Sequence, residues 1–320
     1  PRSISGKMKG AAMARAEETA ASEGDSLPGF GLALAAYLLW GALPLYLSLL
    51  NHIPLPEVLA HRVLWSVPLA LAVLMVMGRT ADLRRALVTP RMLGMAGLTA
   101  ALVSVNWGVY LYAIQSGRAM DAALGYFINP LFSILLGALV LRERLRPVQW
   151  AAVALAGAAV ALLTLEAGRL PLLSLALTVS WGFYALFKRA LPMGPNQGFT
   201  LEVILLSPLA LGWLGWLAAR GALVFGATGA GDVALLMGCG VVTAVPLMLY
   251  ANGAKRLRLT SIALMQYIPP TFIFLIAVFV FGEAFEGARR IAFPMIWAAL
   301  ALYSADLLRR HRQDSGQRGA

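Results

Sequence analysis

Ten long apolar blocks, separated by short polar connections, make up most of this chain. Each block is close to the roughly 20 residues that an α-helix needs to cross a bilayer. The blocks lack the alternation of membrane β-strands, and backbone groups in hydrocarbon must be hydrogen-bonded within their own segment, so we expect helices. The pattern places them at residues 29–50, 55–77, 92–114, 122–141, 147–165, 171–187, 199–219, 233–251, 262–281 and 290–308.

The basic residues are divided unequally between the two sets of connections. Of the 26 Lys and Arg, 20 lie in the tails and the even-numbered connections, five lie in the odd-numbered connections, and Arg62 lies inside a block. Because Lys and Arg accumulate on the cytoplasmic side, we expect both termini in the cytoplasm. An even number of crossings, such as ten, satisfies this expectation. The five residues on the opposite side are Arg118, Arg169, Arg220, Arg289 and Arg290.

Composition agrees with a membrane protein. The chain is 60% hydrophobic and 13% charged, whereas soluble domains have about 45–50% and about 25%. The net charge of +11 is scattered in short clusters, so nucleic-acid binding is not expected. One cysteine cannot form an intrachain disulfide, and three scattered histidines do not suit a metal site. Residues 1–28 are predicted to be a disordered cytoplasmic tail without a signal peptide, and residues 309–320 a basic cytoplasmic tail.

A faint internal repeat runs through the chain at a spacing of 140 residues. Two similar halves are the signature of a transporter. Each half has five predicted helices, and this odd number requires the second half to insert upside down. We therefore expect an all-α integral membrane protein with inverted five-helix repeats at 29–165 and 171–308, around a central cavity. The matched pairs include Tyr110 with Tyr250, Pro130 with Pro270 and Glu143 with Glu283.

Arg62 lies inside the second block, where an arginine costs on the order of 2.5–3.5 kcal/mol by insertion scales. Its counterpart 140 residues later is Glu202, inside the seventh block. Because intramembrane charge is usually functional, we predict that both side chains face the cavity and that Arg62 recognises an anionic or polar group. A structural ion pair, or an Arg62 side chain that reaches the headgroups, is the alternative.

Glu57 and His61 are four residues apart and share a helix face near the outer surface. Histidine can titrate near neutral pH, so this pair could couple transport to protons. An interfacial glutamate beside a packed histidine is the alternative, and the sequence favours it.

Prolines are expected to interrupt two of the helices. A mid-helix proline frees the carbonyl four residues earlier, which is that of Tyr126 in the first half and Gln266 in the second. Asn129 lies one turn from Tyr126 on the same face. Broken helices with exposed backbone acceptors are typical of transporter binding sites, and a kink that only shapes packing is the alternative. The breaks are expected at Pro130, Pro269 and Pro270.

Polar and aromatic residues in two further helices complete the predicted cavity. Amphipathic aromatic side chains suit the wall of a small-molecule site, although ordinary packing explains any single one of them equally well. The predicted cavity comprises Arg62, Asn106, Tyr110, Tyr126, Asn129, Trp181, Tyr184, Glu202 and Gln266.

Enzyme motifs are missing from the sequence. It contains no P-loop, H-E-x-x-H, G-x-S-x-G or dinucleotide-binding fingerprint. We therefore expect neither enzymatic activity nor a cofactor or metal.

Several segments are distinctive beyond their apolar character. They are LAHRVLWS at residues 59–66, LGYFINPL at 124–131, LRERL at 141–145 and LMQYIPPTFIFLIAVFVFGE at 264–283. In these segments the chain resembles the RarD branch of the EamA-type transporters, in the drug/metabolite transporter superfamily. The resemblance covers residues 29–308. It implies two inverted repeats in the bacterial inner membrane and a cavity lined by the first four helices of each half.

The sequence therefore predicts a secondary transporter that moves a small organic solute across the bacterial inner membrane by alternating access. An uncoupled facilitator is the nearest alternative, and a membrane-embedded sensor or assembly factor is the alternative from another class. The expected partners are a small-molecule substrate and the lipid bilayer, with no nucleic acid. Residues 151–161 are rich in small side chains that suit close helix packing. A homodimer in which this helix forms the contact is therefore a further possible partner.

Overall fold

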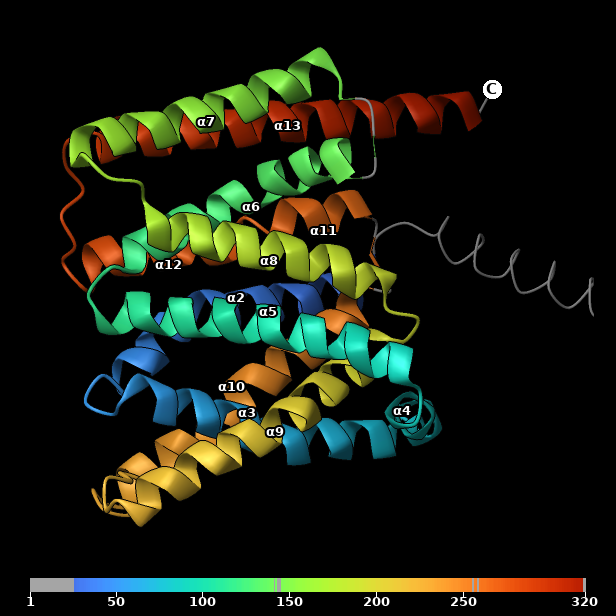
Figure 1. Ribbon diagram of the computed structural model, residues 1–320. Helices are drawn as coiled ribbons and strands as arrows, with labels where there is room; N and C mark the ends of the chain where they lie inside the picture. Colours follow the sequence, from blue (N-terminus) through green and yellow to red (C-terminus); the bar gives the residue numbers. More distant parts are fainter. Residues whose placement is uncertain (1–25, 141, 143–144, 255, 258, 319–320) are drawn as a thin grey trace, which may run out of the picture.

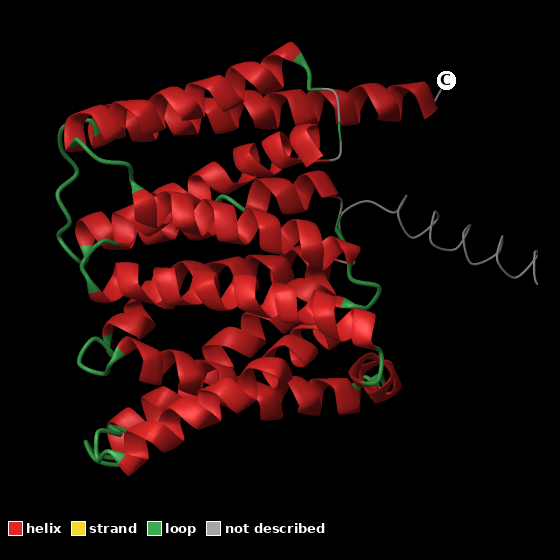
Figure 2. Ribbon diagram, viewed as in Figure 1, coloured by secondary structure: helices red, strands yellow, loops and turns green. Residues whose placement is uncertain are grey.

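The computed structural model describes residues 26–140, 142, 145–254, 256–257 and 259–318, and these residues form helices and no strand (Figures 1 and 2). The helices are α2 (Leu27–Ser48), α3 (Leu55–Val76), α4 (Thr80–Leu87), α5 (Pro90–Gln115), α6 (Ala119–Val140), α7 (Pro147–Ala167), α8 (Leu172–Ala190), α9 (Pro195–Ala219), α10 (Ala230–Ala254), α11 (Leu259–Met265), α12 (Ile268–Phe279) and α13 (Arg289–Arg318).

Nine candidate membrane spans occur among the described residues, and α11 and α12 together supply one of them. Every predicted block coincides with a helix or, for 262–281, with this pair. Helix α8 is not among the nine, because Lys188 and Arg189 in its last turn lower its mean hydropathy. The short helix α4 was missed, and α13 continues to Arg318 through most of the segment predicted as a tail. Most of the predicted N-terminal tail, residues 1–25, lies outside the described residues.

Local sequence explains where the helices begin and end, as α7 illustrates. It begins at Pro147, whose missing N–H is no loss in a first helical turn. It ends at Ala167, and the next residue, Gly168, has a φ of 64°, in the left-handed region that favours glycine.

The predicted helix breaks are realised in only one of the two halves. Helix α6 is continuous through Pro130, so the prediction of a break at this residue is wrong. A single proline removes one backbone hydrogen bond, and the surrounding packing can keep such a helix intact. In the second half, α11 ends at Met265 and α12 begins at Ile268, so Pro269 and Pro270 lie in the first turn of a new helix. The two successive prolines suit a helix start, because neither has an N–H to donate.

The connections gather at two ends of the bundle (Figure 1). We call one the loop end, which carries the α2–α3, α5–α6, α7–α8, α9–α10 and α12–α13 connections. We call the other the tail end, where α2 starts and α13 finishes. The helices between them lie side by side, and α7 and α13 form one flank of the bundle (Figure 1).

The main helix pairs join the first half of the chain to the second. Helix α3 packs on α9 and α10, α2 packs on α10 and α12, and α8 packs on α5 and α6. Helix α7 packs on α13, and α6 packs on α12. The two halves are therefore interleaved along a seam, which we define as the contact region of α2, α3, α5, α6, α8, α9, α10 and α12.

Glycines allow the helices along the seam to approach one another. A Cβ atom added at Gly240 of α10 would lie 2.2 Å from the carbonyl oxygen of Trp65 in α3. A Cβ atom at Gly125 of α6 would lie 2.7 Å from the carbonyl oxygen of Ser174 in α8. Both distances are too short for any side chain, so only glycine permits these crossings.

Replacement of Gly240 by alanine tests this packing. We expect Gly240→Ala to lower the unfolding temperature in detergent, because its Cβ atom would push α3 away from α10 at a typical overpacking cost of about 1–3 kcal/mol. Gly157→Ala in α7 is the matched control, since a Cβ atom there meets nothing within 4 Å. The control should be neutral or stabilising, because alanine favours helix over glycine. Equal unfolding temperatures for the two variants would contradict this account.

Candidate functional site

Arg62 of α3 lies in the seam with only neutral polar and aromatic partners. Its side chain is buried, and its Nε donates to the hydroxyl of Thr243 in α10 at 2.9 Å. Its guanidinium carbon lies 4.5 Å from the ring centroid of Trp107 in α5, which is a cation–π contact. Among the described residues, no carboxylate forms an ion pair with Arg62. A buried cation without a counter-ion is unusual, since charges inside membrane proteins normally pair.

Two tyrosines and an asparagine lie beside Arg62. Tyr110 and Tyr126 both lie near its guanidinium, and their ring centroids are 5.6 Å apart. The Tyr126 hydroxyl donates to the side-chain oxygen of Asn106 at 3.1 Å. The Asn106 amide in turn donates to the hydroxyl of Ser180 in α8 at 3.1 Å. A hydrogen-bonded network therefore runs from the neighbourhood of Arg62 across α6 and α5 to α8.

Aromatic rings extend this network toward the tail end. Trp181 packs edge-on against Tyr126, with centroids 6.4 Å apart, and lies 5.4 Å from the ring of Tyr184. Tyr184 donates its hydroxyl to Glu202 at 3.3 Å. The structure thus brings seven of the predicted cavity residues into one cluster, which we call the Arg62 cluster: Arg62, Asn106, Tyr110, Tyr126, Trp181, Tyr184 and Glu202.

Glu202 of α9 is buried, but its charge is balanced within the protein. Lys188 of α8 forms an ion pair with it at 2.6 Å, and the hydroxyl of Thr99 in α5 donates to the same oxygen at 2.6 Å. The partner of Glu202 among the described residues is therefore Lys188 rather than Arg62. The sequence assigned Lys188 to a connection, because it directly follows an apolar block.

Removal of one partner of the buried Lys188–Glu202 pair should be strongly destabilising. We expect Lys188→Met to lower stability by about 3–5 kcal/mol, because it leaves the Glu202 carboxylate buried without a counter-ion. Thermal unfolding in detergent measures the loss. The double variant Lys188→Met/Glu202→Gln should recover much of it, since no charge is then stranded. A double variant as unstable as Lys188→Met alone would show that lost packing, and not the stranded charge, causes the effect.

Two predicted cavity residues lie outside these contacts. Gln266 is exposed at the break between α11 and α12, where it interacts with Tyr37 of α2. Tyr37 also belongs to an aromatic group with Trp40 and Tyr250, whose ring centroids are 5.6 Å apart. Asn129 is buried in α6, one turn beyond Tyr126. Gln266 therefore lies beside a second aromatic group, which is formed by residues of α2 and α10.

Buried polar atoms in the predicted set lack hydrogen-bond partners among the described residues. They are the Tyr110 hydroxyl, the Asn129 side-chain oxygen and His61 Nε2. A buried polar group without a partner costs about 1–3 kcal/mol, so such groups usually meet a water or a ligand. The Tyr110 hydroxyl is the most informative of the three, because its ring adjoins the unpaired cation of Arg62.

Glu57 and His61 have separate partners. The Glu57 carboxylate accepts the backbone N–H groups of Val224 and Phe225, in the α9–α10 connection, at 2.8–3.1 Å. The ring of His61 stacks on Phe225 at 4.5 Å, and its Nδ1 accepts the indole N–H of Trp65 at 3.1 Å. These contacts agree with the packing alternative, in which Glu57 fixes a connection and His61 fills the space beside it.

Two further glutamates act in the same way at the loop end. Glu166, in the last turn of α7, accepts the N–H of Ala288, just before α13, at 2.8 and 2.9 Å. Glu283 accepts the N–H of Met120, in the first turn of α6, at 2.9 Å. Together with Glu57, each carboxylate binds backbone of the opposite half of the chain. These three carboxylates therefore join the two halves of the chain at the loop end.

Sequence reasoning missed several neighbours of the Arg62 cluster. Threonine and serine are common in membrane helices, where they bond their own backbone, so Thr99, Ser180 and Thr243 gave no distinctive signal. Trp107 could not be distinguished in the sequence from the other apolar residues of its block. The one usable signal was Lys188, a cation one residue beyond the predicted end of a block.

Comparison with known proteins gives a consistent result. The profile of the EamA-like transporter family matches residues 27–165. The chain is 40% identical to "Protein RarD" of Streptomyces exfoliatus, over 91% of this chain and 93% of that protein. It is also 40% identical to an uncharacterized transporter of Vibrio cholerae, over 89% of this chain and 94% of that protein. A crystal structure 22% identical in sequence superimposes with a TM-score of 0.56, covering 86% of this chain and 96% of that one, and shows the same overall fold.

Proposed function

Because this chain belongs to the RarD group of the EamA-like transporter family, we propose that it is a secondary transporter that moves a small organic solute by alternating access through the seam. It is a multi-pass membrane protein of a transporter family. The solute site proposed here is the Arg62 cluster, and the membrane proposed is the bacterial inner membrane.

The observation that carries this proposal is the buried, unpaired charge of Arg62. Trp107 and Thr243 hold the guanidinium in place without neutralising it. The unpartnered Tyr110 hydroxyl adds a hydrogen-bonding group to the same region. An anionic group such as a carboxylate would satisfy both, and the rings of Tyr126 and Trp181 would suit an apolar or aromatic body. We therefore infer a solute that combines a negative charge with an apolar part.

The helix contacts support an inverted repeat. The 140-residue spacing relates α3 to α9, α5 to α10 and, with a drift of one residue, α2 to α8. If each helix is replaced by its counterpart in the other half, the α3–α10 pair becomes the α9–α5 pair, and the α2–α10 pair becomes the α8–α5 pair. All four of these helix pairs are in contact. The polar contacts follow the same exchange, since Arg62 meets Thr243 across the first of these pairs and Glu202 meets Thr99 across its counterpart.

Ten crossings follow if α8 is counted beside the nine candidate spans. It lies alongside its neighbours between the two ends (Figure 1), and α2 starts at the end where α13 finishes. The tail end carries most of the basic residues, so we place it in the cytoplasm. The halves of the repeat are then 29–165 and 171–308.

Cysteine labelling tests this topology. In a Cys239→Ala background, we expect an impermeant maleimide added to intact cells to label Ala227→Cys in the α9–α10 connection. It should leave Arg79→Cys at the tail end unlabelled until the cells are permeabilised. Labelling of both sites from outside, or of Arg79→Cys alone, would contradict the proposed orientation.

Loss of the Arg62 charge tests the proposed site. A thermal-shift screen of purified protein against amino acids, aromatic carboxylates and antibiotics would first identify solutes for uptake into liposomes. We expect Arg62→Gln to reduce the affinity for an anionic solute about ten- to hundredfold, because charge-assisted hydrogen bonds contribute about 1.5–3 kcal/mol. Arg84→Gln in α4 is the control for loss of one positive charge away from the cluster. Dependence of uptake on a pH gradient separates a coupled transporter from a facilitator.

A second variant separates the loss of charge at residue 62 from a loss of folding. Arg62→Lys keeps the charge in place and should retain more transport than Arg62→Gln if charge is the requirement. Undiminished uptake by correctly inserted Arg62→Gln protein would refute the proposed role of Arg62. A stabilising solute that is never taken up by liposomes would instead favour a sensor.

A further inference from the structure

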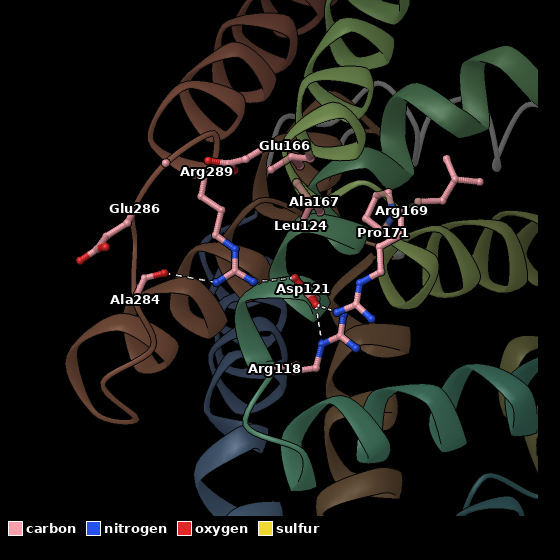
Figure 3. Close-up of a pocket in the computed structure, with 13 residues that line it drawn as sticks. Arg118, Asp121, Leu124, Glu166, Ala167, Arg169, Pro171, Ala284, Glu286 and Arg289 are labelled. Carbon is pink, nitrogen blue, oxygen red and sulfur yellow. Dashed lines mark hydrogen bonds and ion pairs between the residues drawn. The ribbon is translucent and has the colours of Figure 1, made fainter.

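A pocket lies at the loop end, away from the Arg62 cluster. It is a cavity of about 430 Å³ between α6, the end of α7, the α7–α8 connection, the α12–α13 connection and the start of α13 (Figure 3). Three arginines from three separate parts of the chain line it: Arg118 before α6, Arg169 between α7 and α8, and Arg289 at the start of α13. The sequence assigns only five basic residues to this end, so three of the five meet in one cavity.

Asp121 of α6 holds two of these arginines in place. Arg118 donates to one of its oxygens through Nη2 at 2.6 Å and Nε at 2.8 Å. Arg289 donates to the other oxygen through Nη2 at 3.2 Å, and its Nη1 donates to the carbonyl of Ala284 at 3.2 Å. The Asp121 side chain is only 10% exposed, so these bonds are formed largely away from water. The two guanidinium groups are therefore fixed in position before any ligand arrives.

Arg169 is the one of the three arginines that Asp121 does not hold. Arg169 reaches toward Arg118 and Asp121 (Figure 3), and no ion pair to Arg169 occurs among the described residues. The carboxylate of Glu166 is engaged by the N–H of Ala288, and that of Glu286 points away from the arginines (Figure 3). The cavity lining therefore holds three carboxylates and three guanidinium groups, but among the described residues only Asp121 forms ion pairs with lining arginines, and the donor groups of Arg169 remain available to a ligand.

We propose that this cavity binds a phosphate group. Guanidinium groups present planar N–H forks that match the oxygens of phosphate, and three of them can surround a tetrahedral anion from different sides. The wall beside the arginines is apolar, with Leu124, Leu163 and Leu170. A phosphate attached to an apolar body fits this combination. The headgroup of an anionic phospholipid and a soluble phosphate ester share this chemistry, and the site is separate from the Arg62 cluster.

Binding assays on the full chain in neutral detergent test the proposal. Retention of phosphatidylglycerol is measured by native mass spectrometry, and binding of inorganic phosphate by calorimetry. We expect Arg169→Gln to weaken whichever probe binds by about tenfold or more, since it removes charge-assisted bonds without disturbing the ion pairs of Asp121. Arg220→Gln removes the same charge at the same end and should change binding less than about twofold, because Arg220 stacks on Trp216 at 4.4 Å outside the cavity.

A second variant tests whether the ligand occupies the cavity, without a change in any charged residue. Ala167→Trp should fill the cavity from its wall while it leaves all three arginines present, and it should also weaken binding. Retention of the lipid without binding of phosphate would identify a headgroup site, and the reverse would identify a site for a soluble ester. The proposal is overturned if neither probe binds, if Arg169→Gln binds as the native chain does, or if Arg220→Gln loses as much affinity.

Discussion

The close approach of helices from opposite halves is the constraint on which the rest of this structure depends. A carbonyl of α3 lies so near Gly240 of α10 that no side chain could be accommodated there. This contact brings Thr243, less than one turn further along α10, within hydrogen-bonding distance of Arg62. Gly125 does the same for α6 and α8, and so helps to place Tyr126 against Trp181. The polar network of the seam therefore follows from backbone packing that only small residues permit.

The two halves resemble each other in helix contacts but differ in charge. Glu202 has Lys188 beside it, so its carboxylate is neutralised inside the protein. Arg62 occupies the corresponding position in the other half and has no acid among the described residues. A buried ion without a partner is costly, and proteins keep such an ion mainly where a ligand or a moving part uses it. At the loop end, Glu57, Glu166 and Glu283 each accept backbone N–H groups from the other half of the chain.

Much of the fold could be predicted from the sequence because membrane helices need long apolar segments, which stand out in any chain. The cluster around Arg62 was largely predictable for a related reason, since a charge inside such a segment is rare and the repeat supplies its counterpart. The partners of Glu57 and Glu202 were not predictable, because they come from connections and helix ends whose tertiary positions the sequence does not reveal. Gln266 lies outside the Arg62 cluster, because the 140-residue repeat that relates it to Tyr126 places it in the other half of the bundle, where it interacts with Tyr37. The arginines around Asp121 are far apart in sequence and meet only in the folded chain.

Alternating access requires the seam to open during transport, and the single native cysteine reports on such an opening directly. Cys239 of α10 is fully buried, and its carbonyl accepts from the hydroxyl of Thr243, which also accepts from Arg62. In native membranes, we expect a small water-soluble thiol reagent to modify Cys239 of the folded protein, and a transported solute to change the rate of modification. The account would be contradicted if Cys239 stayed unmodified in the folded protein under all conditions yet reacted readily once the protein was unfolded in detergent.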